Sequence, residues 1–135
     1  MRLRCKTAVP SREELVKLGP PWATGQAVFH AVIEREYLVF GLSVFGGNLW
    51  ADVLAEGGYL VCYPFFLFDI VDGRVSRYWE AVASPDVFRV APPLLHGEFF
   101  FDDLLENVPA AEEAFEILRK QMEDEFEPRS PEAEE

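Results

Sequence analysis

Four potential metal ligands, one histidine and three carboxylates, lie within eight residues of one another late in the chain. They are His96, Glu98, Asp102 and Asp103. Zinc and calcium sites need ligands at characteristic short spacings, and three phenylalanines at 99–101 interrupt this set at a spacing that fits neither metal. We therefore predict no metal site and no cofactor, and we interpret the segment as a solvated acidic loop anchored by buried phenylalanines.

Nucleophilic catalysis is not indicated by any residue of the chain. Cys62 lies in an apolar run, and apolar surroundings disfavour the thiolate that would act as the nucleophile. Ser43 and Ser76 lie inside predicted strands, and the sequence has no G-x-S-x-G motif. We predict no catalytic residue and no enzyme activity.

Negative charge is concentrated towards the C-terminal end of the sequence. Residues 1–97 contain nine basic and ten acidic side chains, whereas residues 98–135 contain three basic and fourteen acidic ones. This asymmetry is typical of an acidic tail or of an acidic docking face, and it argues against binding to nucleic acids or anionic membranes. The partner-binding carboxylates that we predict are Glu112, Glu113, Glu116, Glu123 and Asp124.

An arginine beside a tryptophan is a second candidate binding surface. Arg77 and Trp79 lie two residues apart in a predicted strand, and both residue types are enriched among interface hot spots. Trp22 follows two prolines in a predicted loop and is a further exposed-aromatic candidate. Packing in the core is the alternative for both tryptophans.

A helix predicted at 109–126 positions the acidic residues. Pro109 suits the first helical position because an amide hydrogen is not needed there. The helix carries an apolar stripe formed by Ala111, Ala114, Phe115, Leu118, Met122 and Phe126. We expect this stripe to dock on a sheet, the carboxylates to face outward, and Glu116 to pair with Lys120 four residues on.

A long apolar run at 59–68 predicts the central strand of that sheet. Both alternating faces of the run are apolar, which indicates cover on both sides. Asp72-Gly73 predicts a two-residue hairpin turn, with 74–82 as the partner strand. At Pro64 we expect a bulge or a local edge, because proline donates no ladder hydrogen bond.

Shorter segments complete an expected antiparallel meander of five to seven strands. Further strands are predicted at 2–8, 37–45, 49–55 and 87–91. Residues 27–34 are predicted as a strand, and a helix at 24–36 fits nearly as well. Gly46-Gly47 and Gly57-Gly58 lack the lysine of a phosphate-binding loop and indicate turns. Ser11 and Glu14 form a capping box that predicts a short helix through Leu18, and one or two helical turns are expected at 101–107.

Length and composition indicate one α+β domain at 1–127, followed by an acidic disordered tail at 128–135. The 135-residue chain is half hydrophobic, which is enough to form a core without metal or disulfide support. No apolar run reaches the roughly 18 residues of a membrane span, and the first residues do not form a secretory signal, so we expect a cytoplasmic protein. Cys5 and Cys62 are expected to be reduced, with Cys62 packed as a small hydrophobe.

Residues 68–80 carry an aromatic-x-x-x-Asp-Gly-basic-aliphatic-x-x-x-Trp pattern. This segment, about a tenth of the chain, resembles the final hairpin of the SnoaL and ketosteroid-isomerase-like (NTF2-like) proteins. The resemblance implies a cone-shaped pocket lined by Trp50, Tyr63, Tyr78 and Trp79. It also implies that Asp52 or Asp69 could serve as a base.

Three functions remain open at this point. The first is a non-enzymatic inhibitor or immunity-type module whose acidic face neutralises a basic partner, such as a nuclease toxin or an enzyme of transcription or DNA defence. The second is an NTF2-like small-molecule pocket protein or enzyme. The third is that the charge only keeps an ordinary domain soluble.

Overall fold

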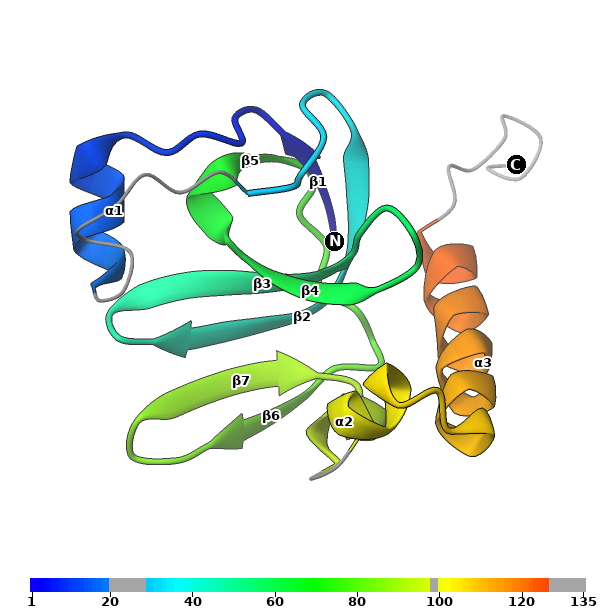
Figure 1. Cartoon of the computed structure of the whole chain (residues 1–135). Helices are drawn as coiled ribbons and strands as arrows, with labels where there is room; N and C mark the ends of the chain where they lie inside the picture. The colour runs from blue at the N-terminus through cyan, green and yellow to red at the C-terminus, as the bar shows by residue number, and fades with distance from the viewer. Residues whose placement is uncertain (20–28, 98–99, 127–135) are drawn as a thin grey trace.

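The computed structural model describes residues 1–19, 29–97 and 100–126, and it has the α+β architecture that the sequence predicts. Within these residues a seven-stranded antiparallel sheet carries a short N-terminal helix and a longer C-terminal helix (Figure 1). The strands are β1 (Arg2–Cys5), β2 (Glu36–Phe45), β3 (Asn48–Leu54), β4 (Leu60–Pro64), β5 (Phe68–Asp72), β6 (Glu80–Ala83) and β7 (Val87–Ala91). The helices are α1 (Arg12–Leu18), α2 (Phe100–Leu105) and α3 (Pro109–Glu125), with 3-10 turns η2 (Phe65–Leu67) and η3 (Pro93–His96). The predicted tail at 128–135 and Trp22 lie outside the described residues.

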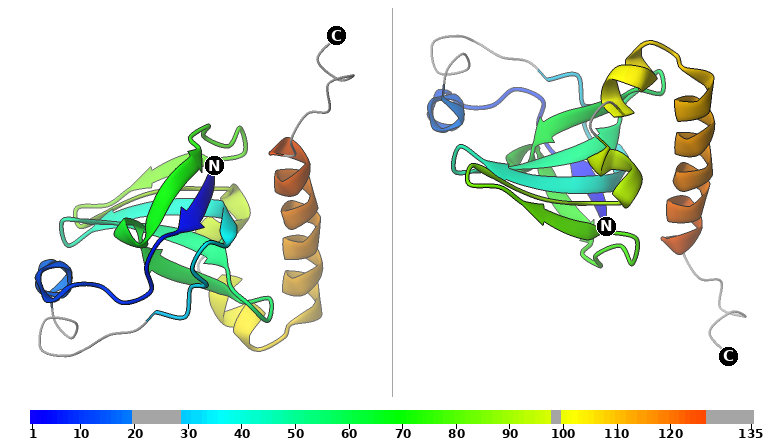
Figure 2. Two further views of the ribbon diagram at one scale, coloured as in Figure 1. Left: turned by 90° about the horizontal axis from the view of Figure 1, so that it is seen from above. Right: turned by 90° about the horizontal axis from the view of Figure 1, so that it is seen from below.

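Strand β2 connects the two parts of the sheet. One edge of β2 pairs with β3, and the other edge pairs first with β1 and then with β7. The strands follow the order β4-β3-β2-β1-β5, and β6 joins through β7. A register shift between Val39 and Gly41 marks a bulge in β2, and a bulge bends its strand. The sheet accordingly curls, as the views from above and from below show (Figure 2).

The turn between β2 and β3 is the tight hairpin that the sequence predicts. Phe45 pairs with Asn48, and the two residues between them, Gly46 and Gly47, have φ angles of 58° and 75°. A two-residue type I′ turn requires positive φ at both central positions, which glycine adopts without steric cost. The glycine pair therefore determines the register of β2 and β3.

The prediction of one central strand at 59–68 is wrong. The run divides into β4, the turn η2 and the start of β5, and β4 pairs only with β3 among the described residues. Pro64, the last residue of β4, has no amide hydrogen with which to continue the ladder, so the expected edge at this residue is confirmed. The turn η2 rotates the chain, so the same core receives Tyr63, Leu67 and Phe68. This explains why the run is apolar at both odd-numbered and even-numbered positions.

Asp72-Gly73 does not form the predicted hairpin, and 74–82 is not a partner strand. Gly73 is not among the glycines with positive φ. The Asp72 carboxylate instead accepts hydrogen bonds from the Arg74 amide (3.1 Å) and from the Arg74 guanidinium (2.6 Å to Nη2). Residues 73–79 follow β5 as an irregular loop, and only Glu80–Ala83 is a strand, which pairs with β7.

Residues 29–35 form neither the strand nor the helix considered for this segment; residues 24–28 lie outside the described part. Their backbone groups bond to neighbouring segments instead of to a ladder. The Val32 amide donates to Tyr37 Oη at 2.9 Å, and the Glu34 amide donates to the Cys5 carbonyl at 2.8 Å. Glu34 has φ 74°, which reverses the chain before β2.

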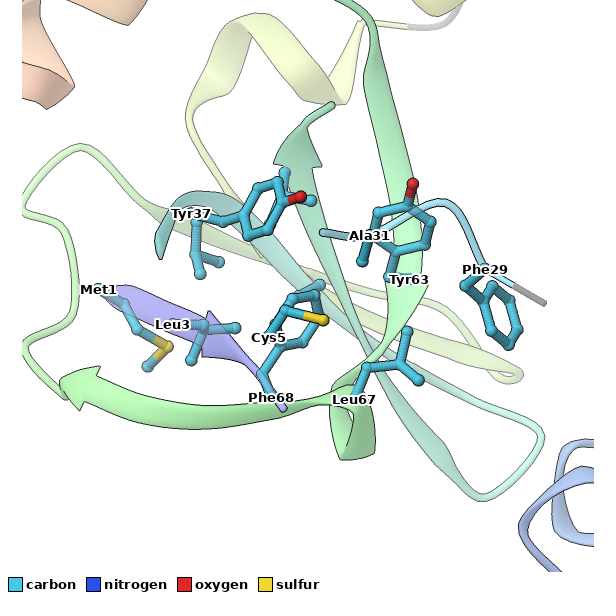
Figure 3. Packing of buried hydrophobic residues seen from close by; sticks show 12 residues of the cluster. Met1, Leu3, Cys5, Phe29, Ala31, Tyr37, Tyr63, Leu67 and Phe68 are labelled. Carbon is cyan, nitrogen blue, oxygen red and sulfur yellow. The ribbon is translucent and has the colours of Figure 1, made fainter. Parts of the chain in front are cut away.

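A first hydrophobic core fills the inside of the curled sheet (Figure 3). Leu3, Val39 and Leu67 are fully buried there, from β1, β2 and η2. The ring of Phe68 packs edge-on against Tyr37, with centroids 5.9 Å apart. This core brings together β4 and β5, the strands at the two ends of the order β4-β3-β2-β1-β5.

A second core joins the two C-terminal helices to the opposite face of β2. The predicted stripe of α3 is confirmed, since Phe115, Leu118 and Met122 are buried. The Phe115 ring lies 5.4 Å from Phe40 of β2, measured between centroids. The consecutive residues Val39 and Phe40 thus point into different cores, as alternation in a strand requires.

Helix α1 begins at the predicted capping box. The Glu14 amide donates to Ser11 Oγ at 3.2 Å, and the Ser11 amide donates to Glu14 Oε1 at 2.9 Å. Gly19, with φ 79°, follows the last helical residue. Helix α1 and helix α3 lie at opposite ends of the molecule (Figure 1).

Candidate functional site

The acidic residues of α3 lie in two stripes. At 3.6 residues per turn, positions 112, 116, 119 and 123 align beside the buried face, while positions 113, 117, 120 and 124 align opposite to it. The side stripe consists of Glu112, Glu116, Arg119 and Glu123, and the outward stripe consists of Glu113, Ile117, Lys120 and Asp124. The five predicted carboxylates are therefore divided between two surfaces.

Arg119 neutralises part of the side stripe. Its guanidinium donates to Glu123 Oε1 at 2.9 Å and, through Nε, to Glu116 Oε2 at 3.0 Å. The hydrogen bond with Arg119 lowers the pKa of Glu116 below its usual value. The prediction that Glu116 pairs with Lys120 is wrong, because the Glu116 carboxylate pairs with Arg119 instead. A helical projection of the sequence would have found this contact.

The outward stripe is unpaired. Glu113, Lys120 and Asp124 are exposed and form no ion pair within the described part of the chain. Ile117 is exposed between them. This surface carries two carboxylates and one ammonium group, with an apolar side chain at its centre.

A cavity of about 520 Å³, here called the α2–α3 pocket, lies between the side stripe and the β3–β4 turn. Leu54, Leu60 and Phe115 contribute apolar surface to its lining. Glu112, Glu116 and Arg119 line it from α3. Two strongly exposed apolar residues also contribute, Tyr59 at 63% and Leu105 at 72% exposure. In Figure 1 the β3–β4 turn extends towards α3.

Several contacts hold the β3–β4 turn in place. The Ala55 amide donates to the Tyr59 carbonyl at 2.7 Å, and Gly57 and Gly58 have φ angles of 88° and 87°. The Tyr59 ring lies over Gly57, where a Cβ atom would be 3.3 Å from the ring. Tyr59 was assigned to the central strand by its sequence, so its position at the pocket was not anticipated.

Glu125 anchors the C-terminal end of α3 to the loop at 73–79. Its carboxylate accepts hydrogen bonds from Ser76 Oγ at 2.7 Å and from the Arg77 amide at 2.8 Å. The Arg2 guanidinium donates to the Phe126 carbonyl at 3.2 Å. No sequence signal indicates the Glu125–Ser76 contact, because 49 positions separate the two residues.

Arg77 and Trp79, the predicted second binding surface, lie on the loop at 73–79 and not on a strand. Arg77 is exposed on the loop and stacks over the Tyr78 ring, with 5.0 Å between the guanidinium carbon and the ring centroid. Trp79 is half-buried and packs against both cores. This position agrees with the core-packing alternative for Trp79 and leaves Arg77 as the accessible member.

A polar cluster crosses the sheet from β4 to β7. Arg89 Nη2 donates to Asp52 Oδ2 at 2.6 Å, and Cys62 of β4 lies directly opposite Asp52 in the ladder. Burial raises the pKa of the Asp52 carboxyl, and the Arg89 charge opposes this shift. Gly41 allows this close packing, because a Cβ there would lie 3.0 Å from Asp52 Oδ2.

Cys62 is exposed, which contradicts its interpretation as a packed hydrophobe. Desolvation of the thiol and the neighbouring Asp52 charge raise its pKa to about 12. This raised pKa disfavours the thiolate, which is the nucleophilic form of cysteine. The interior residue is the other cysteine, Cys5.

The residues implied by the NTF2-like resemblance do not converge on one pocket. Tyr63 packs in the first core, Tyr78 packs against the second, and Trp50 stacks on Phe45 with centroids 5.0 Å apart. Asp69 is exposed and lies 3.6 Å from Lys6. None of the six residues implied by the resemblance, Trp50, Asp52, Tyr63, Asp69, Tyr78 and Trp79, lines the α2–α3 pocket.

The metal-ligand set considered in the sequence is not assembled in the described residues. His96 Nε2 lies 2.9 Å from the Glu80 carbonyl, Asp102 is exposed, and Glu98 lies outside the described part. No cluster of three potential metal ligands occurs among the described side chains. Of the described helices, none combines the length and the apolar character needed to cross a membrane.

Comparisons of this chain with protein-family models, with curated proteins and with solved structures found no match.

Proposed function

We propose that this protein is a non-enzymatic binding module, acting in the cytoplasm, that docks on a basic protein through the acidic surface of α3. The observation that carries the proposal is the outward stripe. Glu113 and Asp124 are exposed and have no ion-pair partner among the described residues, while the opposite face of the same helix is buried in the second core. The helix is thus fixed in position and its unpaired carboxylates face solvent.

An acidic surface of this kind favours a particular class of partner. Long-range attraction accelerates encounter with a positively charged protein and disfavours approach to nucleic acids. The same carboxylates can occupy a cleft in which the partner would bind nucleic acid. The proposed role is therefore an inhibitor or immunity-type protein for a basic nucleic-acid-binding enzyme or toxin.

Association kinetics test this proposal. A low-salt pull-down from the source organism supplies the partner, and the on-rate is measured at two salt concentrations. We expect the on-rate to fall sharply as salt rises, because screening shortens to about 8 Å at physiological ionic strength. It should also fall in the triple variant Glu112→Lys, Glu113→Lys, Asp124→Lys, which leaves the Arg119 ion pairs intact.

A matched control separates docking from solubility. The variant Glu13→Lys, Glu80→Lys, Asp86→Lys changes net charge equally at exposed positions away from α3. Docking through α3 predicts a slower on-rate in the first variant and a much smaller change in the control. If charge serves only solubility, both variants change precipitation and neither changes the binding constant. That result, or an on-rate insensitive to salt, would contradict the proposal.

The alternative of an NTF2-like pocket protein or enzyme has weaker support. It requires Trp50, Tyr63, Tyr78 and Trp79 to line one cavity around a carboxylate base. These side chains are distributed over different packing clusters, and the candidate base Asp52 is paired with Arg89. The α2–α3 pocket is built from other residues.

A further inference from the structure

We propose that the α2–α3 pocket binds an arginine side chain of the basic partner, together with one apolar side chain next to that arginine in the partner's sequence. This inference rests on the proposed function and specifies where and how the partner is recognised. It identifies Glu112 and Tyr59 as the residues that select the arginine.

The charge balance of the pocket favours a cation. Glu112 lines the pocket and forms no ion pair in the described part of the chain. Glu116 and Glu123 share the single guanidinium of Arg119, so this triad keeps one negative charge uncompensated. Of this triad, Glu116 and Arg119 line the pocket and compensate each other, so the net charge that a cation meets in the pocket is the free carboxylate of Glu112.

The apolar lining of the pocket indicates a ligand that has apolar surface as well as a positive charge. Leu54, Leu60, Phe101, Leu104 and Phe115 contribute to the lining, and these surfaces suit an alkyl stem or an aliphatic side chain. A volume of about 520 Å³ falls within the roughly 300–1,000 Å³ that ligand pockets span. It exceeds what one arginine side chain fills, which is why an apolar neighbour belongs to the ligand.

Arginine fits this pocket better than lysine. The Tyr59 ring is largely exposed, and a guanidinium can stack on an aromatic face while donating two parallel hydrogen bonds to a carboxylate. An ammonium group is a compact, strongly hydrated charge that neither stacks flat on a ring nor donates two parallel hydrogen bonds from a planar fork. The protein already contains this stacking geometry, with Arg77 over Tyr78 and Arg35 over Tyr37.

The two walls of the pocket are held by separate parts of the fold. On one side, Glu56 of the β3–β4 turn is ion-paired with Arg35 and accepts a hydrogen bond from Tyr37 Oη at 3.3 Å. On the other side, Phe115 anchors α3 in the second core. The two backbone segments that carry Glu112 and Tyr59 are thus positioned before a ligand arrives, which lowers the ordering cost of binding.

Peptide titration followed by amide NMR tests the proposal on the full chain. The probe is a capped peptide with a central Leu-Arg-Leu segment in a Gly-Ser background. Its matched controls replace the arginine by lysine or by citrulline, which has the same shape without the charge. We expect the arginine peptide to shift the amide signals of Gly57, Gly58 and Leu105, and to bind at least tenfold more tightly than the citrulline peptide.

Variants assign the contacts within the pocket. Glu112→Gln and Tyr59→Ala should each weaken the arginine peptide several-fold. Glu13→Gln, an exposed position on α1 outside the proposed binding surfaces, should leave its affinity unchanged. Replacing both leucines of the peptide by serine should also weaken binding, because the apolar lining would then have no partner. Equal affinity of the arginine and citrulline peptides would overturn the proposal.

The position of the shifts distinguishes failure of this inference from failure of the proposed function. Shifts confined to Glu113, Lys120 and Asp124 would leave docking on acidic α3 in place and would exclude the pocket. Shifts at Gly57 and Gly58 with a partner on-rate insensitive to salt would support the pocket and contradict steering by the acidic helix.

Discussion

The carboxylates of this protein differ mainly in whether another part of the chain already binds them. Asp52 is held by Arg89, Asp72 by Arg74, and Glu125 by Ser76. Glu113 and Asp124 have no such contact in the described residues. The net charge therefore overstates how many carboxylates are free to bind a partner. We expect substitutions of the paired carboxylates to affect folding and substitutions of the unpaired ones to affect binding.

Asp72 should make the stability of the protein depend on acid pH. Hydrogen bonds from the Arg74 guanidinium and amide lower the pKa of Asp72 from 3.8 to about 2. Because folding lowers this pKa, the carboxylate stabilises the folded state above pH 3.8, and the contribution is lost as the pH falls through about 2. Asp72→Asn should lower the melting temperature at pH 7, and its difference from the wild type should shrink between pH 4 and pH 2.

Asp69→Asn is the matched control for Asp72→Asn. Asp69 also lies in β5, but it is exposed, and its carboxylate pairs with Lys6 alone among the described residues, at 3.6 Å. Exposed ion pairs contribute little, so this variant should follow the wild type at every pH. A melting-temperature difference for Asp72→Asn that is the same at pH 2 and pH 7 would show that the effect does not come from the carboxylate.

Among the elements, α3 has two distinct roles. Its inner face forms most of the helical side of the second core, and its C-terminal end is tied to the loop at 73–79 through Glu125. Its other faces carry the side stripe and the outward stripe. One helix therefore holds the fold together and presents the proposed docking surface.

Phe115→Ala should cost about 3–5 kcal/mol of unfolding free energy, because it removes a buried ring and leaves a cavity. Phe115 is only 8% exposed and packs against the rings of Phe40 and Phe100. Chemical denaturation with urea gives this difference directly.

Ile117→Ala on the same helix is the control for Phe115→Ala. Ile117 lies on the outward stripe and is 55% exposed, so its truncation should change stability by about 0.5 kcal/mol or less. Equal losses for the two variants would mean that the inner face of α3 is not the face that docks on the sheet.

Across the whole molecule, the acidic helix and the apolar hairpin tips lie at opposite ends (Figure 1). Val44 pairs with both Leu49 and Phe88, and all three side chains are exposed at the tips of the β2–β3 and β6–β7 hairpins. The negative charge of α3 is therefore separated from the apolar side chains at these two hairpin tips. A basic partner that is steered by charge would approach the α3 end first.

Removal of residues 128–135 should leave the thermal stability nearly unchanged. This segment has the sequence Pro-Arg-Ser-Pro-Glu-Ala-Glu-Glu, which offers little apolar surface to bury. Calorimetry of the full and truncated chains measures the effect. A large fall in melting temperature on truncation would show that the tail packs against the domain.

Local signals in the sequence were sufficient for several elements. The capping box of α1, the proline at the start of α3, its apolar stripe and the Gly46-Gly47 turn are all confirmed. Each of these features is caused by residues within a few positions of one another, so the physical reason is contained in the local sequence. The α+β class followed from the same signals.

Only the tertiary structure decided the features that depend on distant residues. The apolar run at 59–68 became two strands in different places because β5 pairs with β1, more than sixty residues earlier. Asp72-Gly73 does not form a hairpin because β5 pairs with β1 and because Glu125 of α3 binds the following loop at Ser76 and Arg77. The α2–α3 pocket depends on how the second core places α3 beside the β3–β4 turn. The local sequence does not specify these arrangements, since the free energy that selects them comes from long-range pairing and burial.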